Sequence, residues 1–125
     1  MPFVKIHLAD SIPPDIINSF ACDVRTSLVE ALQIEETVGQ VMVYQTPKEF
    51  RSAHISRNVN FVFIEIFMYC GRTAEMKKSL MEKINRLAHN SLGVNPKDIN
   101  CCIIELPPEN CCGGVMHKYI EGLAK

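Results

Sequence analysis

The chain has 125 residues and a formal net charge of −1, and 47% of its residues are hydrophobic. This length fits one folded domain, the hydrophobic fraction excludes a disordered chain, and no apolar run reaches the roughly 18 residues of a membrane span. The thinly spread Lys and Arg residues disfavour nucleic acid as the main partner, and without a recognisable export signal we expect a cytoplasmic protein.

The first half of the chain predicts a strand, a helix and a second strand. Residues 3–8 are rich in the β-branched and aromatic residues typical of strands. Residues 15–32 carry apolar side chains at the three-to-four spacing of a buried helical face, and Pro13 and Pro14 suit the first turn of that helix. Residues 41–44 then predict a closing strand.

The second half predicts the same three elements. Residues 61–68 predict a strand, and residues 73–92 predict a helix with Thr73 as its N-cap and Gly93 at its end. Residues 99–105 predict the closing strand.

The two halves match when the sequence is shifted by 60 residues. Apolar character is kept at this one offset over some 45 positions, which indicates a duplication. We place the repeats at about 2–47 and 61–107, with a connector at 48–60 and a C-terminal segment at 108–125, all within a single domain 1–125. The matching pairs include Phe3 with Phe63, Ile6 with Ile66, Phe20 with Leu80, Val24 with Ile84, Leu32 with Leu92, Val43 with Ile103 and Pro47 with Pro107.

Two tandem βαβ units predict an α+β fold. Each right-handed crossover makes a parallel strand pair, so the units give a four-stranded sheet with two helices on one face. The other face offers Ile, Val, Met and Cys rather than alternating charges, so we expect other subunits to cover it. The fused repeat favours a closed homotrimer.

The six cysteines are interpreted as free thiols. Neither adjacent pair has the two-to-four-residue separation of paired zinc ligands, and we predict no bound metal. Cys101 and Cys102 fall in a predicted strand, on opposite faces, where we interpret them as structural. Cys111 and Cys112 fall in a predicted loop, where they either fill space or carry a reactive thiol.

Four stretches of the sequence resemble the tautomerase superfamily. They are residues 1–8, which begin Met-Pro, residues 70–78, which contain Gly-Arg-Thr, and residues 92–99 and 105–114. Short members, such as 4-oxalocrotonate tautomerase, are single βαβ units, and the chain is most similar to the fused members that resemble malonate semialdehyde decarboxylase. The resemblance implies removal of Met1, a catalytic N-terminal proline, and small 2-oxo or enol carboxylic acids as substrates, with no cofactor.

The chemistry of such a site explains the choice of residues. A free α-amino group has a pKa near 7.7–8, and an apolar pocket beside a cation disfavours its charged form. A neutral proline nitrogen can then move a proton between an enol oxygen and a carbon as base and then as acid. By resemblance we assign this role to Pro2, and we assign Arg72 to the substrate carboxylate or oxyanion.

Several further residues occupy positions where the family carries site residues. Tyr69 and Cys70 precede the Gly-Arg pair, and Cys111 replaces an aromatic residue. Asn100, or Gln40 in the first repeat, stands where short members carry a second arginine. We include Tyr69, Asn100 and Cys111 as candidate substrate-binding residues. His7 is interpreted as a structural sheet histidine.

Two alternatives to a tautomerase remain. With one matching arginine and no clear acid near Thr37, a decarboxylase-like lyase or hydratase is less favoured than simple tautomerisation. A non-catalytic oligomeric binding module on the same fold is the other. Arg51, His54 and Arg57 in the connector are interpreted as exposed, with reach into a neighbouring site as the alternative.

Overall fold

A computed structural model of the chain describes residues 2–112. The first repeat contains strand β1 (Phe3–Ala9), helix α1 (Pro14–Leu32) and strand β2 (Gln40–Thr46). The second contains strand β3 (Val62–Tyr69), helix α2 (Ala74–Leu92) and strand β4 (Ile99–Leu106). The short 3₁₀ helix η1 (Lys48–Phe50) follows β2. Two others, η2 (Pro96–Asp98) and η3 (Pro108–Asn110), lie before and after β4.

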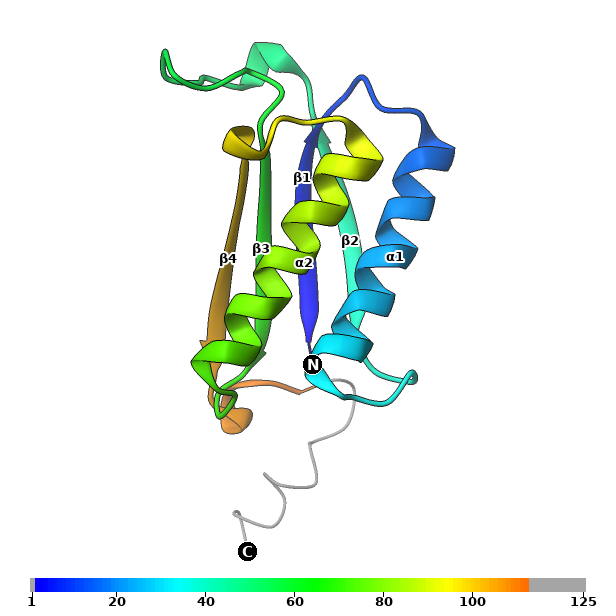
Figure 1. Cartoon of the computed structure of the whole chain (residues 1–125), viewed down its shortest axis with the longest axis vertical. Coiled ribbons are helices and arrows are strands. Elements are labelled where there is room, and N and C mark those ends of the chain that lie inside the picture. The colour runs from blue at the N-terminus through cyan, green and yellow to red at the C-terminus, as the bar shows by residue number, and fades with distance from the viewer. Residues whose placement is uncertain (1, 113–125) are drawn as a thin grey trace, which may run out of the picture.

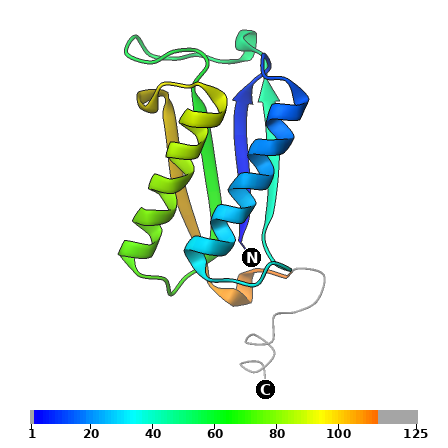
Figure 2. The same ribbon diagram turned by 45° about the vertical axis from the view of Figure 1, so that its right-hand side comes forward.

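The four strands form one mixed sheet in the order β2-β1-β3-β4. Strands within each repeat are parallel, and β1 and β3 are antiparallel, with Ile6 opposite Ile64. Both helices cover the same face of this sheet (Figure 1, Figure 2). The predicted α+β fold of two tandem βαβ units is therefore confirmed, and the antiparallel β1–β3 pair places the starts of the two repeats at opposite ends of the sheet.

The hydrophobic core lies between the sheet and the two helices. Alternate residues of β1 and β3 point toward the helices because successive strand residues face opposite sides. Each fully buried Leu- or Ile-sized side chain stabilises the fold by about 1.5–3 kcal/mol relative to an exposed one. The side chains that meet there without solvent exposure include Val4, Ile6, Leu8, Phe20, Val24, Leu28, Ile64, Ile66, Met68, Leu80 and Ile84.

The uncovered face of the sheet carries aromatic and charged side chains. His7 is stacked between the rings of Tyr44 and Phe63, at centroid distances of 5.1 and 5.8 Å. Its Nε2 atom lies 2.8 Å from a carboxylate oxygen of Glu65. These contacts fit the interpretation of His7 as a structural sheet histidine, and Tyr44 and Phe63 remain 37% and 38% exposed.

Candidate active site

Pro2 lies buried at the start of β1, against the turn that leads into β2. Its carbonyl oxygen accepts a hydrogen bond from the Gln40 backbone N–H at 3.2 Å. Gly39 in that turn has φ +95°, a conformation that favours glycine, and a Cβ on it would lie 3.9 Å from the proline ring. The turn therefore lies beside the Pro2 ring, and β2 is bonded to the Pro2 carbonyl oxygen.

A cavity of about 640 Å³ opens beside Pro2. Its walls come from Pro2 and Phe3, from residues 37–40, from Arg25 on α1, and from Cys111 and Cys112. Figure 1 and Figure 2 show why these segments meet: the N-terminus, the end of α1 and residues 107–112 lie at one end of the sheet. The structure thus brings together Pro2 and Cys111, two of the predicted site residues.

Arg25 is the charged residue in the described wall of this cavity. Its Nε donates to the Gly39 carbonyl oxygen at 2.9 Å, and its Nη2 donates to the carbonyl oxygens of Glu36 and Val38. These bonds tie α1 to the turn that packs on Pro2. Sequence reasoning missed Arg25, because its position depends on the path of the turn, which no spacing pattern reveals.

Tyr69 and Arg72 lie at the same end of the sheet, after β3. Arg72 Nη1 donates to the Tyr69 carbonyl oxygen at 3.4 Å, and neither residue is part of the cavity wall described above. Burial and, to a smaller extent, the neighbouring thiols of Cys111 and Cys112 raise the pKa of the Tyr69 phenol. That proximity places Tyr69 beside the two cysteines that border the cavity.

Asn100 lies at the opposite end of the sheet from Pro2 within one chain. It pairs with Phe63 at the start of the β3–β4 ladder, whereas Phe3, next to Pro2, lies opposite Phe67. A cavity of about 150 Å³ borders Asn100. A single chain therefore does not bring Asn100 to Pro2.

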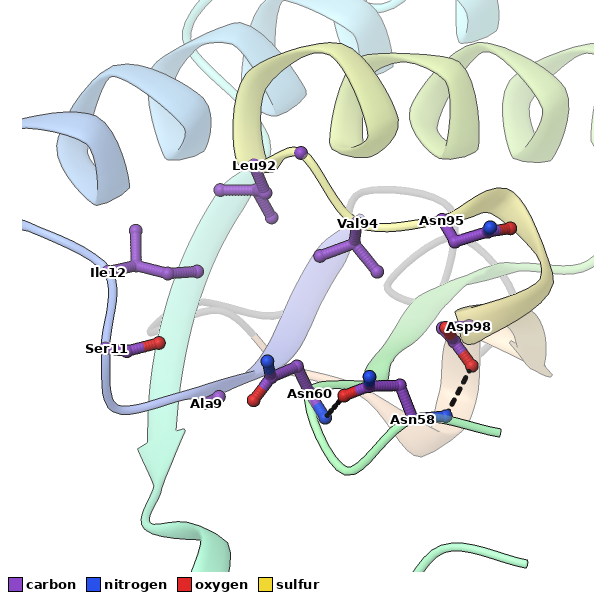
Figure 3. Close-up of a pocket in the computed structure, with 10 residues that line it drawn as sticks. Ala9, Ser11, Ile12, Asn58, Asn60, Leu92, Val94, Asn95 and Asp98 are labelled. Atoms are coloured by element: carbon purple, nitrogen blue, oxygen red, sulfur yellow. Dashed lines mark hydrogen bonds between the residues drawn. The ribbon is translucent and has the colours of Figure 1, made fainter. Parts of the chain in front are cut away.

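A third cavity, of about 280 Å³, lies at the same end as Asn100. Figure 3 shows its wall of small amides and apolar side chains, with Leu92 and Val94 facing Asn58 and Asn60. Within residues 2–112, no cluster of three or more His, Cys, Asp or Glu side chains is arranged to hold a metal ion, and no helix is long and apolar enough to cross a membrane. Met1 and residues 113–125, including most of the predicted C-terminal segment, lie outside the described part of the chain.

A family model described as "Tautomerase enzyme" matches residues 32–112, more than half of the chain. The chain therefore belongs to the tautomerase superfamily, as its sequence motifs predict. No curated protein sequence matches it.

Solved structures share the fold over nearly the whole chain. A fused 4-OT symmetric trimer is 15% identical, with a TM-score of 0.83 and coverage of 90% of this chain and 91% of that one. The FG41 malonate semialdehyde decarboxylase, inhibited by 3-bromopropiolate, is 23% identical, with a TM-score of 0.80 and coverage of 97% and 96%. A macrophage migration inhibitory factor-like protein from Entamoeba histolytica is 18% identical, with a TM-score of 0.79 and coverage of 91% and 96%.

Proposed function

We propose that the protein is a cofactor-independent keto–enol tautomerase of small 2-oxo and enol carboxylic acids. The observation that carries the proposal is the position of Pro2, buried at the wall of an open cavity in a chain of the tautomerase family. Removal of Met1 turns the Pro2 nitrogen from an amide into a secondary amine, which has the lone pair that a base needs.

The proton moves between oxygen and carbon of the substrate. For an enol acid, the Pro2 nitrogen takes the proton of the enol hydroxyl and leaves an enolate, whose oxygen becomes a carbonyl when the adjacent carbon is protonated. The protonated proline then returns a proton to the adjacent carbon, so one O–H bond breaks and one C–H bond forms. The raised pKa of the Tyr69 phenol keeps it protonated near neutral pH, where it serves as a donor to the substrate oxygen as negative charge develops.

We assign the substrate carboxylate to Arg72 rather than to Arg25. Arg25 donates from Nε and Nη2 to three backbone carbonyl oxygens, which suits a role in positioning the turn against Pro2. Within residues 2–112, Arg72 makes one long hydrogen bond of 3.4 Å, which leaves more of its planar guanidinium for a carboxylate. Cys111 lines the entrance to the cavity in this proposal, and Asn100 would reach a Pro2 cavity only from another subunit.

We further propose that the protein is a cytoplasmic homotrimer. The uncovered sheet face exposes Tyr44 and Phe63, which favours burial against other copies of the chain. Similar fused 4-OT structures are described as symmetric and asymmetric trimers, which supports the same arrangement here.

Ketonisation of phenylenolpyruvate, followed by ultraviolet absorbance, tests this function. We expect turnover by mass-verified protein that lacks Met1, and a strong loss of kcat in Pro2→Ala. Loss of a charge-assisted carboxylate contact of about 1.5–3 kcal/mol predicts a fall of about 10- to 100-fold in kcat/KM for Arg72→Gln. Arg86→Gln, which removes an exposed arginine on the far part of α2, is the matched control and keeps wild-type kinetics.

Two outcomes would contradict the proposal. Equal rates in wild type and Pro2→Ala, or no turnover in either, would remove the support for a proline base. Consumption of malonate semialdehyde faster than that of phenylenolpyruvate, with release of carbon dioxide, would favour the lyase alternative. Malonate semialdehyde decarboxylases are among the structurally similar proteins.

A further inference from the structure

The internal repeat gives the Pro2 cavity a counterpart at the other end of the sheet. Val38 and Gln40 line the Pro2 cavity, and the residues 60 positions later, Asp98 and Asn100, line the cavity of about 150 Å³. The two cavities therefore occupy equivalent places in the two repeats, at the point where the first strand of each repeat begins.

The two cavities differ in what precedes the first strand. Pro2 stands at the beginning of β1, whereas the connector precedes β3 and supplies Ser52, Ala53, His54 and Arg57 to the second cavity, next to Phe61. The second cavity therefore has no proline amine, and its basic side chains, Arg57 and His54, come from the connector.

Arg51 fixes the shape of the connector. Its Nη1 donates to the carbonyl oxygens of Val59 and Phe61, at 2.9 and 2.6 Å, and its guanidinium lies 4.4 Å from the centre of the Phe61 ring. A turn closed by the Arg57 N–H and the His54 carbonyl oxygen, at 2.9 Å, completes the loop. These bonds fix the backbone path of the connector that borders the cavity.

Arg57 and His54 each keep a nitrogen available for a ligand. Within residues 2–112 the Arg57 side chain makes no hydrogen bond or ion pair, and His54 bonds through Nδ1 to Ser56 Oγ at 2.8 Å, which leaves Nε2. The carboxylate of Asp98, 4% exposed, accepts from the Asn58 N–H at 2.9 Å (Figure 3). That bond offsets part of the negative charge that Asp98 brings to the wall.

We propose that this second cavity binds a small carboxylate without turning it over. Arg57 and His54 would hold the carboxylate, with the Asn100 amide as a further donor and the Phe61 ring against the carbon skeleton. The volume of about 150 Å³ is below the roughly 300–1,000 Å³ of pockets for drug-sized ligands, which restricts the ligand to a few carbons. The proposal is independent of catalysis at Pro2.

Titration of the ¹⁵N-labelled protein with pyruvate, followed by NMR, tests the site. Amides of residues 56–58 report on the second cavity, and those of Phe3 and Gln40 report on the Pro2 cavity. We expect saturable shifts at residues 56–58 in wild type and in Pro2→Ala alike. The affinity for pyruvate that these shifts report is at least tenfold lower in Arg57→Gln and unchanged in Arg86→Gln. Arg57→Lys keeps the charge but not the planar guanidinium, and its affinity lies between those of Arg57→Gln and wild type.

Several outcomes would overturn the proposal. Shifts confined to the Pro2 cavity, linear shifts without saturation, or equal affinity in Arg57→Gln and wild type would each remove the second site. Saturation by inorganic phosphate but not by pyruvate would overturn the assignment to carboxylates. Inactivity toward phenylenolpyruvate combined with saturable shifts at residues 56–58 would contradict the proposed function and leave this site intact.

Discussion

The adjacent cysteines of β4 differ in the environment of their thiols. Cys101 packs against the hydrophobic core, and burial, with a smaller contribution from Cys102, raises the pKa of the Cys101 thiol to about 12. Burial and then Glu65 raise the pKa of Cys102 on the opposite face. The different surroundings confirm the prediction that the two side chains point to opposite faces.

This difference predicts selective alkylation. A raised pKa lowers the thiolate fraction at a given pH, and a rise from 9 to about 12 lowers that fraction roughly a thousandfold near pH 8. We expect iodoacetamide to modify Cys101 at least about tenfold more slowly than the exposed Cys22, measured by peptide mass spectrometry over time. Unfolding in urea should abolish the difference, and equal rates in the folded protein would contradict the burial argument.

Individual site residues were predictable to different extents. Pro2 and Arg72 were both predicted from motifs, but only Pro2 lies in the described wall of the cavity, together with Cys111 from the C-terminal segment. Arg25 was not found, because its role comes from three backbone carbonyl oxygens in a turn rather than from a side-chain pattern. Asn100 matches a family position, yet the antiparallel β1–β3 pair puts it at the far end of the sheet.

The two helices begin in different ways, although they are copies of one element. Helix α2 starts at Thr73, whose side chain accepts a hydrogen bond from the Met76 N–H at 3.2 Å. Helix α1 starts at Pro13 with no side-chain cap. The sequence predicts both starts, since Thr is a common N-cap and Pro suits the first turn.

Thr73→Ala is expected to destabilise the protein by about 1 kcal/mol, because it leaves an N–H at the start of α2 without its partner. Urea denaturation of the variant and wild type measures the change in the free energy of unfolding. Ser79→Ala, at an exposed position within the same helix, is the matched control and should leave stability the same or slightly higher. No change in Thr73→Ala would show that the cap contributes nothing.

Strands and helices were predictable because their periodicity is repeated in two copies. The predicted helix 15–32 corresponds to α1 (Pro14–Leu32), and the predicted strand 61–68 to β3 (Val62–Tyr69). The connector was not predictable in the same way. Its path depends on the bonds from Arg51 to Val59 and Phe61, which have no periodicity.

On the scale of the whole molecule, the uncovered sheet face predicts that copies of the chain assemble into a trimer. Phe63 stands on this face in a central strand, stacked against His7. Burial of such a ring stabilises an interface by about 1.5–3 kcal/mol, and a carboxylate in its place would have to lose its hydration. We expect analytical ultracentrifugation of wild type to give the mass of three chains of 14.1 kDa.

Phe63→Glu should sediment as a monomer with a folded circular dichroism spectrum. Lys78→Glu, on the exposed side of α2 where the lysine side chain is 76% exposed, should remain a trimer. A monomeric wild type, or a trimeric Phe63→Glu, would contradict the assignment of this face to subunit contacts.

The most direct test of the central claim compares two forms of the same sequence, one with a free Pro2 amine and one with residues retained in front of it. Pro2→Ala still has a primary amine, whereas an amide at Pro2 removes the basic lone pair and keeps every side chain. We predict that mass-verified protein with the free amine ketonises phenylenolpyruvate roughly 10²- to 10⁴-fold faster than the blocked form, the usual contribution of a general base. Equal rates in the two forms would contradict the claim that Pro2 is the catalytic base.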